Sequence, residues 1–219
     1  MRDIVLALAP RGRSIDVLDI GCGNGALAFR LADALPTASI VGIDISPANV
    51  AVATARRRDE ASGDRVRFVC ADYRTCPVAP VDLIVTDTAL HFIAGNPDAL
   101  WRKLSGDLRS GGTVVCAMAY DCAHNRRLRT ARRILRALRS TAVDRVLLSI
   151  ARRQFGGEMD DDLLRERIEY MYIPPEQLMT ARVRDHLTRE LGLRLISEMN
   201  VPGASATQLK QQVTVFRKD

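Results

Sequence analysis

The residues Asp19-Ile20-Gly21-Cys22-Gly23-Asn24-Gly25 place a carboxylate immediately before three closely spaced glycines. Glycines tolerate positive φ and let a ligand press against bare backbone, which is how many proteins hold a nucleotide cofactor. Asp19 narrows the choice of cofactor, because a carboxylate at this point repels a pyrophosphate and favours a ligand that carries an ammonium group. The chemistry expected here is the binding of a nucleotide-like cofactor with positive charge.

Regular elements flank this glycine turn on both sides. The apolar run Val17 to Ile20 precedes it, and a helical pattern begins at Ala26. A strand, a glycine turn and a helix in this order are typical of doubly wound α/β folds, in which the helix N-terminus faces the ligand. Many unrelated proteins share this arrangement, so the turn alone leaves the cofactor open.

The chain continues with short β-branched runs that alternate with helical patterns, which predicts a parallel sheet covered on both faces. A helix is expected from Pro47, and another from Asn96-Pro97 through Leu108 to a stop at Gly111-Gly112. Two closing strands are expected to be joined by a turn at Pro202-Gly203. The strands expected after the glycine turn are 39–44, 65–70, 81–86, 113–118, 193–198 and 212–216.

Three of these strands end in polar residues, at Asp44, at Asp72-Tyr73 and at Thr86 with Leu90-His91-Phe92-Ile93 soon after. Together with Asp19-x-Gly-x-Gly-x-Gly, this order resembles the class I S-adenosylmethionine (SAM)-dependent methyltransferases of the small-molecule type. The resemblance covers roughly residues 14–120 and the final hairpin. It implies an α/β fold with a doubly wound, mostly parallel seven-stranded sheet, an antiparallel last strand and a helical insertion after strand 5.

The resemblance also implies a cofactor site for SAM. Asp19, Gly21 and Gly23 would form its loop, Asp44 would meet the ribose, and the backbone carbonyl of Thr86 would meet the methionine part. Ile45, next to Asp44, is also expected to contact the cofactor. Asp72 would accept a hydrogen bond from the adenine amino group, with Tyr73 beside the ring. Plainer interpretations remain for two of the acids: Asp44 caps the helix that begins at Pro47, and Asp72 forms an Asx-turn.

Two histidines are candidates for a catalytic base. His91 follows the fourth strand near the expected methyl-transfer position, and an unperturbed histidine has a pKa of about 6.5, which suits proton removal at neutral pH. A packing or cofactor-positioning role is the alternative for His91. His124, at the start of the insertion, is the second candidate. No metal site is predicted, because the five cysteines form no CxxC pair and have no histidine at metal-ligand spacing.

Positive charge is concentrated in the insertion, at about 121–173, where apolar residues recur every three or four positions and predict a long helical segment. The chain carries a net charge of +6, yet Arg126 to Arg153 alone contains ten arginines and one acid, a net of +9. These arginines form either a solvated face or a docking site for an anionic partner, which would be a small molecule, an acyl-carrier protein or RNA. Few aromatics interleave with them, which disfavours nucleic acid. Residues 170–173 are expected to return to the active site as an apolar wall, and a further helix is expected from Pro174-Pro175.

The predicted protein is a single methyltransferase domain over residues 1–219, with the insertion as a lid or substrate element. We expect transfer of a methyl group to an O or N atom of a small molecule, of the kind made in secondary metabolism. Three alternatives remain open: a methyltransferase of RNA or protein, an NAD(P)-dependent oxidoreductase, and a non-catalytic subunit with the SAM fold. The odd number of cysteines and the lack of a signal-like or membrane-length apolar run predict a cytoplasmic location.

Overall fold

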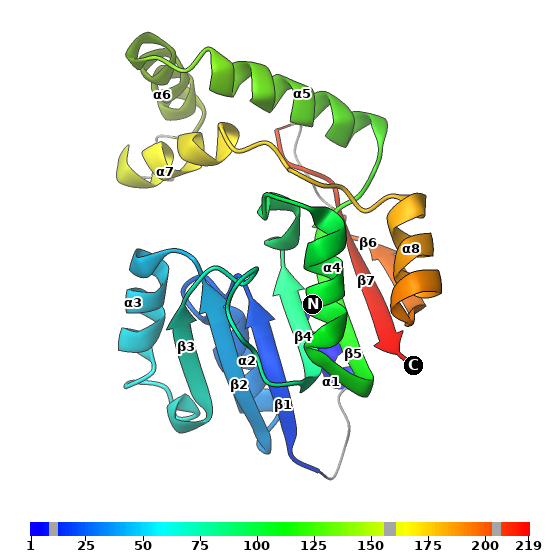
Figure 1. Cartoon of the computed structure of the whole chain (residues 1–219). Helices are drawn as coiled ribbons and strands as arrows, with labels where there is room; N and C mark the ends of the chain where they lie inside the picture. The colour runs from blue at the N-terminus through cyan, green and yellow to red at the C-terminus, as the bar shows by residue number, and fades with distance from the viewer. Residues whose placement is uncertain (9–12, 156–160, 203–206) are drawn as a thin grey trace.

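The computed structural model describes residues 1–8, 13–155, 161–202 and 207–219, and a seven-stranded sheet lies at its centre (Figure 1). The strand order is β3-β2-β1-β4-β5-β7-β6. Neighbours from β3 to β5 pair in parallel, whereas β7 is antiparallel to both β5 and β6. The predicted fold class is therefore confirmed. The strands are β1 Ile15–Ile20, β2 Ala38–Asp44, β3 Val66–Cys70, β4 Val81–Asp87, β5 Leu108–Ala119, β6 Leu193–Asn200 and β7 Gln211–Lys218.

Helices cover both faces of the sheet, and three more lie over the carboxyl ends of its parallel strands (Figure 1). The helices of the sheet layers are α1 Arg2–Leu8, α2 Ala26–Ala34, α3 Pro47–Arg56, α4 Pro97–Gly106 and α8 Ala181–Leu191. The three helices of the insertion are α5 Ala123–Ala137, α6 Thr141–Phe155 and α7 Asp161–Met171. Short 3₁₀ turns lie at Gly63–Arg65 and at Leu90–Phe92. Helix α1 was not predicted from the sequence.

Alternating residues of the central strands build two separate cores, because successive side chains of a strand point to opposite faces. Val17 and Leu83 pack on one face with Phe29 of α2. Leu18 packs on the other face with Trp101 of α4, in the core that also includes residues of α8. Burial on both faces fixes the strands, so their carboxyl ends meet at one edge of the sheet.

The boundary between α4 and β5 differs from the prediction. The helix was expected to run through Leu108 to Gly111-Gly112, but it ends at Gly106 and Leu108 is already the first residue of β5, where it pairs with Val81. The register of this pair of strands shifts just after Val81, so both glycines lie inside the strand. Arg109 holds the irregular stretch by ion pairs to Asp82 at 2.6 Å and to Asp16 at 2.7 Å.

The insertion is three helices rather than one long segment. Helix α5 ends near Leu138, and the Ser140 hydroxyl accepts the Val143 N–H at 3.3 Å at the start of α6. The prediction that Pro174-Pro175 begins a helix is also wrong. That stretch is irregular apart from a single bridge between Met179 and Tyr120, and the helix begins only at Ala181, where Thr180 caps α8.

The predicted turn at Pro202-Gly203 lies partly outside the described residues. The two strands it would join, β6 and β7, pair from Asn200 with Gln212 to Leu193 with Lys218. Within the described parts of the chain, every helix is too short or too polar to cross a lipid bilayer.

Candidate functional site

The glycine turn after β1 lies against the chain that leaves β4. Gly21 has φ +71, and a Cβ on it would lie 2.2 Å from the Cβ of Ala89, so only glycine fits there. Gly23 has φ +53, and a Cβ there would meet nothing within 4 Å, so this glycine faces open space. Strand order reverses between β1 and β4, which is where doubly wound folds bind their ligands.

Asp44 at the end of β2 ties this loop to the next helix. Its Oδ2 accepts the Gly23 N–H at 2.9 Å, and its Oδ1 accepts the Ser46 N–H at 2.8 Å. Helix α3 is capped by Ser46, whose hydroxyl accepts the Asn49 N–H, and not by Asp44 as the plainer interpretation had it. Ile45, the next residue, is 69% exposed, which is unusual for isoleucine and leaves an apolar surface at this edge.

Asp19 is a buried carboxylate, 1% exposed, whose Oδ2 has no hydrogen-bond partner among the described residues. Burial raises its pKa from 3.8 to about 7, and the charges of Asp87 and Asp44 add to the effect. Burial also raises the pKa of Asp87, at the end of β4. Three carboxylates thus converge at the switch point, and a cation placed among them would stabilise their charged forms.

Asp19 should make the stability of the ligand-free protein depend on pH. Because the folded state holds a proton that the unfolded chain releases, the free energy of unfolding should fall as the pH rises from about 4 to about 7. Asp19→Asn should remove this part of the dependence and stabilise the protein at pH 8 by up to about 4 kcal/mol. Denaturant unfolding of both proteins at several pH values measures this. Parallel curves for the two would contradict it.

The remaining residues of the predicted cofactor site lie in different environments in the structure. Asp72 lies at the edge, where its carboxylate pairs with Arg74 at 2.5 Å and accepts the Arg74 N–H, so its Asx-turn is also present. Thr86 is fully buried, and its hydroxyl has no partner among the described residues. Tyr73 is buried in the core instead, where its hydroxyl donates to Asp107 at 2.9 Å. The prediction that the Tyr73 side chain lies beside the adenine is corrected accordingly.

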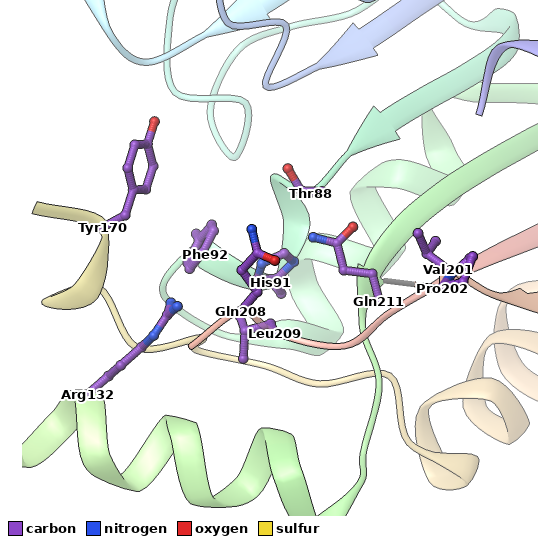
Figure 2. Close-up of a pocket in the computed structure, with 10 residues that line it drawn as sticks. All are labelled: Thr88, His91, Phe92, Arg132, Tyr170, Val201, Pro202, Gln208, Leu209 and Gln211. Atoms are coloured by element: carbon purple, nitrogen blue, oxygen red, sulfur yellow. The ribbon is translucent and has the colours of Figure 1, made fainter. Parts of the chain in front are cut away.

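A cavity of about 430 Å³ lies beside the end of β4, between the sheet and the insertion (Figure 2). Its walls come from the chain after β4, from α5 and α7, and from the ends of β6 and β7. None of the residues that line it is acidic, and one, Arg132, is a cation. The lining residues are Thr88, His91, Phe92, Arg132, Tyr170, Val201, Pro202, Gln208, Leu209 and Gln211.

His91 lines this cavity but is not an ordinary histidine. Its side chain is 1% exposed, and its Nδ1 accepts the Ala119 N–H at 3.5 Å, which leaves Nε2 to carry the proton of the neutral ring. Burial lowers the pKa of His91 to about 4, with a contribution from the charge of Arg132. The ordinary pKa assumed from the sequence is therefore wrong, and the ring is neutral and weakly basic at physiological pH.

His124 does not line the cavity. Its Nε2 lies 2.9 Å from the Gln208 carbonyl, and the neighbouring Asn125 bonds to the carbonyls of Tyr120 and Lys210, each at 2.7 Å. These contacts fasten the start of α5 to the segment before β7, which gives His124 a structural role. Among the described residues, no group of histidine, cysteine or acidic side chains is arranged to hold a metal ion.

Some residues of this site were not predicted from the sequence, and some residues predicted to line the site do not line the cavity. Thr88 has φ +63, which is strained for a β-branched residue, and no sequence signal marks it. Arg132 was one arginine among many. Of the predicted apolar wall, only Tyr170 lines the cavity, whereas Tyr172 is buried within the insertion and its hydroxyl donates to Asp144 at 2.6 Å.

The fold is shared with known methyltransferases. The structure is similar to that of the N-methyltransferase NodS from Bradyrhizobium japonicum in complex with S-adenosyl-L-homocysteine, with a TM-score of 0.60 and 16% identity over 99% of this chain and 85% of that one. The chain therefore has the fold of this methyltransferase.

The sequence matches are consistent with this class. Residues 17–112 match the family model described as "Methyltransferase domain", which agrees with the predicted methyltransferase class. The chain is similar to the trans-aconitate 2-methyltransferase of Streptomyces avermitilis, with 40% identity over 45% of this chain and 37% of that protein. It is also similar to the malonyl-[acyl-carrier protein] O-methyltransferase of Hahella chejuensis, with 30% identity over 52% of this chain and 39% of that protein. The matches thus span well under two thirds of the length of these relatives.

Proposed function

We propose that this protein transfers the methyl group of SAM to a small anionic molecule, and that, of the O and N atoms expected as acceptors, the methylated atom is a carboxylate oxygen. The observation that carries the proposal is the position of the substrate cavity. It lies beside the end of β4, where the switch-point carboxylate Asp87 directly precedes the lining residue Thr88, and acids are absent from its described lining. One edge of the sheet thus combines a subsite for a cation with a subsite for an anion.

The residues present fit the cofactor. The unpartnered Oδ2 of Asp19 and the carboxylates of Asp44 and Asp87 suit the ammonium and sulfonium charges of SAM. The open space at Gly23 suits a ligand pressed against the backbone, and exposed Ile45 suits an apolar ring. SAM supplies, when bound, a methyl group already activated on a positive sulfur.

Within this proposal, the other predicted residues keep their roles. Asp44 accepts hydrogen bonds from the ribose, Asp72 accepts one from the adenine amino group, and the Thr86 carbonyl meets the methionine part. The protein's contribution to rate is then mainly to hold the acceptor in line with the methyl group, which supplies about 7 to 11 kcal/mol in favourable cases.

The absence of a strong base from the described cavity lining favours a carboxylate as the acceptor. A hydroxyl or ammonium acceptor must lose a proton, whereas a carboxylate is already ionised at neutral pH and its oxygen forms the new bond to carbon without losing one. The described lining offers only a weak base, His91. The substrates named for the two relatives, trans-aconitate and malonyl-[acyl-carrier protein], carry free carboxylates, which supports an anionic acceptor, either free or bound to a carrier.

His91 is assigned here to donate a hydrogen bond from Nε2 to the acceptor. His91→Ala should lower turnover by about tenfold, rather than the hundredfold or more that removal of a general base costs, and should leave SAM affinity unchanged. Wild-type turnover at saturation should show no inflection near pH 6.5, because the ring is already neutral there. A bell or step at that pH, lost in His91→Ala, would instead make His91 the base.

The proposal is tested with methyl-labelled SAM and a panel of acceptors. Mono-, di- and tricarboxylic acids, phenols and primary amines are each incubated with the protein, and labelled products are identified by mass spectrometry. Labelled methyl esters of acids are the expected products. Labelled phenols or amines alone would move the acceptor atom to a hydroxyl or amine and require a base not yet identified.

Location and partners complete the proposal. All five cysteines are free thiols, which suits a reducing cytoplasm. The acceptor is a small molecule, and the insertion serves as its lid. Methylation of RNA or protein would instead require binding that weakens steeply with salt, which filter-binding at two salt concentrations measures.

A further inference from the structure

Arg132 differs from other arginines of the insertion in its position. It extends from α5 toward the cavity, on the side of His91 and Phe92 (Figure 2). Its two terminal nitrogens donate to the carbonyls of Ile173 at 3.1 Å and Thr207 at 3.2 Å. Two segments far apart in the sequence therefore hold the guanidinium in place.

Within the described part of the chain, no carboxylate lies at ion-pair distance from Arg132. Arg126 pairs with Asp121 at 2.9 Å, and Arg139 pairs with Glu169. Desolvation lowers the pKa of Arg132, consistent with a cation held away from water. A partly buried cation that meets only neutral carbonyls costs free energy, which an anionic ligand would recover.

The guanidinium of Arg132 has N–H donors beyond those that these two carbonyls accept. It carries five N–H groups in a planar fork, and the two carbonyls occupy only part of them. A carboxylate matches this fork with two parallel hydrogen bonds. The cavity around it has apolar surface from Phe92 and Leu209, which suits a short carbon chain.

We propose that Arg132 is a specificity-determining residue that binds a second carboxylate of the acceptor, so that the protein selects molecules with two or more carboxylates. The group held by Arg132 is distinct from the one that is methylated, because an ion pair withdraws electron density from the oxygen that must attack the methyl carbon. The reacting carboxylate lies near Thr88 and His91, and the second one lies against α5. This inference rests on the proposed function and specifies its substrate class.

The test uses the full chain saturated with S-adenosylhomocysteine (SAH) and titrated by calorimetry at constant ionic strength. The probes are tricarballylate, a saturated tricarboxylate, and its neutral trimethyl ester. Wild type should bind the acid and not the ester, and Arg132→Gln should weaken binding of the acid by about tenfold or more while SAH affinity stays unchanged. The matched control is Arg133→Gln, because Arg133 is the adjacent residue and is exposed.

A second variant separates binding from support of the fold. Arg132→Lys keeps the charge but not the fork, so its affinity for tricarballylate should lie between those of wild type and Arg132→Gln, whereas a purely structural role would not rank the variants by charge. The inference is overturned if Arg132→Gln binds the acid as wild type does, if wild type in complex with SAH fails to bind it, or if the ester binds equally well. If wild type fails to bind SAH at all, the proposed function fails first and this inference falls with it.

Discussion

Gly21→Ala is expected to abolish measurable SAH binding and to destabilise the fold by about 2 to 5 kcal/mol. The new methyl group would lie 2.2 Å from the Cβ of Ala89, and the residue would also be held at φ +71. The turn after β1 and the chain after β4 cannot both keep their places, and these two segments form the switch point. Denaturant unfolding and calorimetric titration with SAH measure the two effects.

The matched control for this change is Gly111→Ala. Gly111 has nearly the same backbone angle, φ +72, but a Cβ there would meet nothing within 4 Å, and the residue lies at the opposite end of the sheet. Gly111→Ala should lower the free energy of unfolding only by the cost of the left-handed backbone, about 1 to 2 kcal/mol, and should leave SAH affinity unchanged. If the two alanine variants melted alike and both bound SAH as wild type does, the close approach at Gly21 would have no functional role.

Asp44→Asn is expected to weaken SAH binding by about a hundredfold, since hydrogen bonds to a charged group contribute about 1.5 to 3 kcal/mol each. The carboxylate already accepts the N–H groups of Gly23 and Ser46. An amide has one accepting oxygen, so its NH₂ group would face one of these donors and disturb the loop. The free energy of unfolding should fall by only about 1 to 3 kcal/mol, which a folded variant tolerates.

Asp16→Asn serves as the control for Asp44→Asn. Asp16 also lies on a central strand, but at the far end of β1, where its carboxylate pairs with Arg109 at 2.7 Å. The same chemical change there should leave SAH affinity at the wild-type value. Wild-type affinity in Asp44→Asn itself would reduce Asp44 to a structural tie between the glycine loop and α3.

The fold was predictable because its signals are local. Buried strands carry short apolar, β-branched runs, such as Leu83 to Val85 in β4, and Pro47 and Asn96 mark helix starts that the structure retains. Strand ends in a parallel sheet must meet at one edge, so the convergence of Asp19 and Asp44 followed from topology. The parallel strands followed from these local signals, whereas the antiparallel last strand was expected from the resemblance to methyltransferases.

The parts that could not be predicted depend on contacts between distant segments. The Tyr73 side chain turns inward because Asp107, which follows α4, accepts its hydroxyl. The pKa of His91 is low because the ring is buried, with Ala119 at the end of β5 against it and the charge of Arg132 of α5 nearby. Arg132 became distinct from its neighbouring arginines only when the folded insertion brought it to the carbonyls of Ile173 and Thr207.

The measurement that tests the central claim most directly is a calorimetric titration of the purified protein with SAH, with NAD⁺ and NADP⁺ as controls. Three converging carboxylates and a glycine turn should give micromolar binding of SAH and none of the nicotinamide cofactors, whose pyrophosphate those carboxylates repel. Binding of NAD⁺ or NADP⁺, or the absence of SAH binding by the wild-type protein, would contradict the assignment of this edge of the sheet as a SAM site.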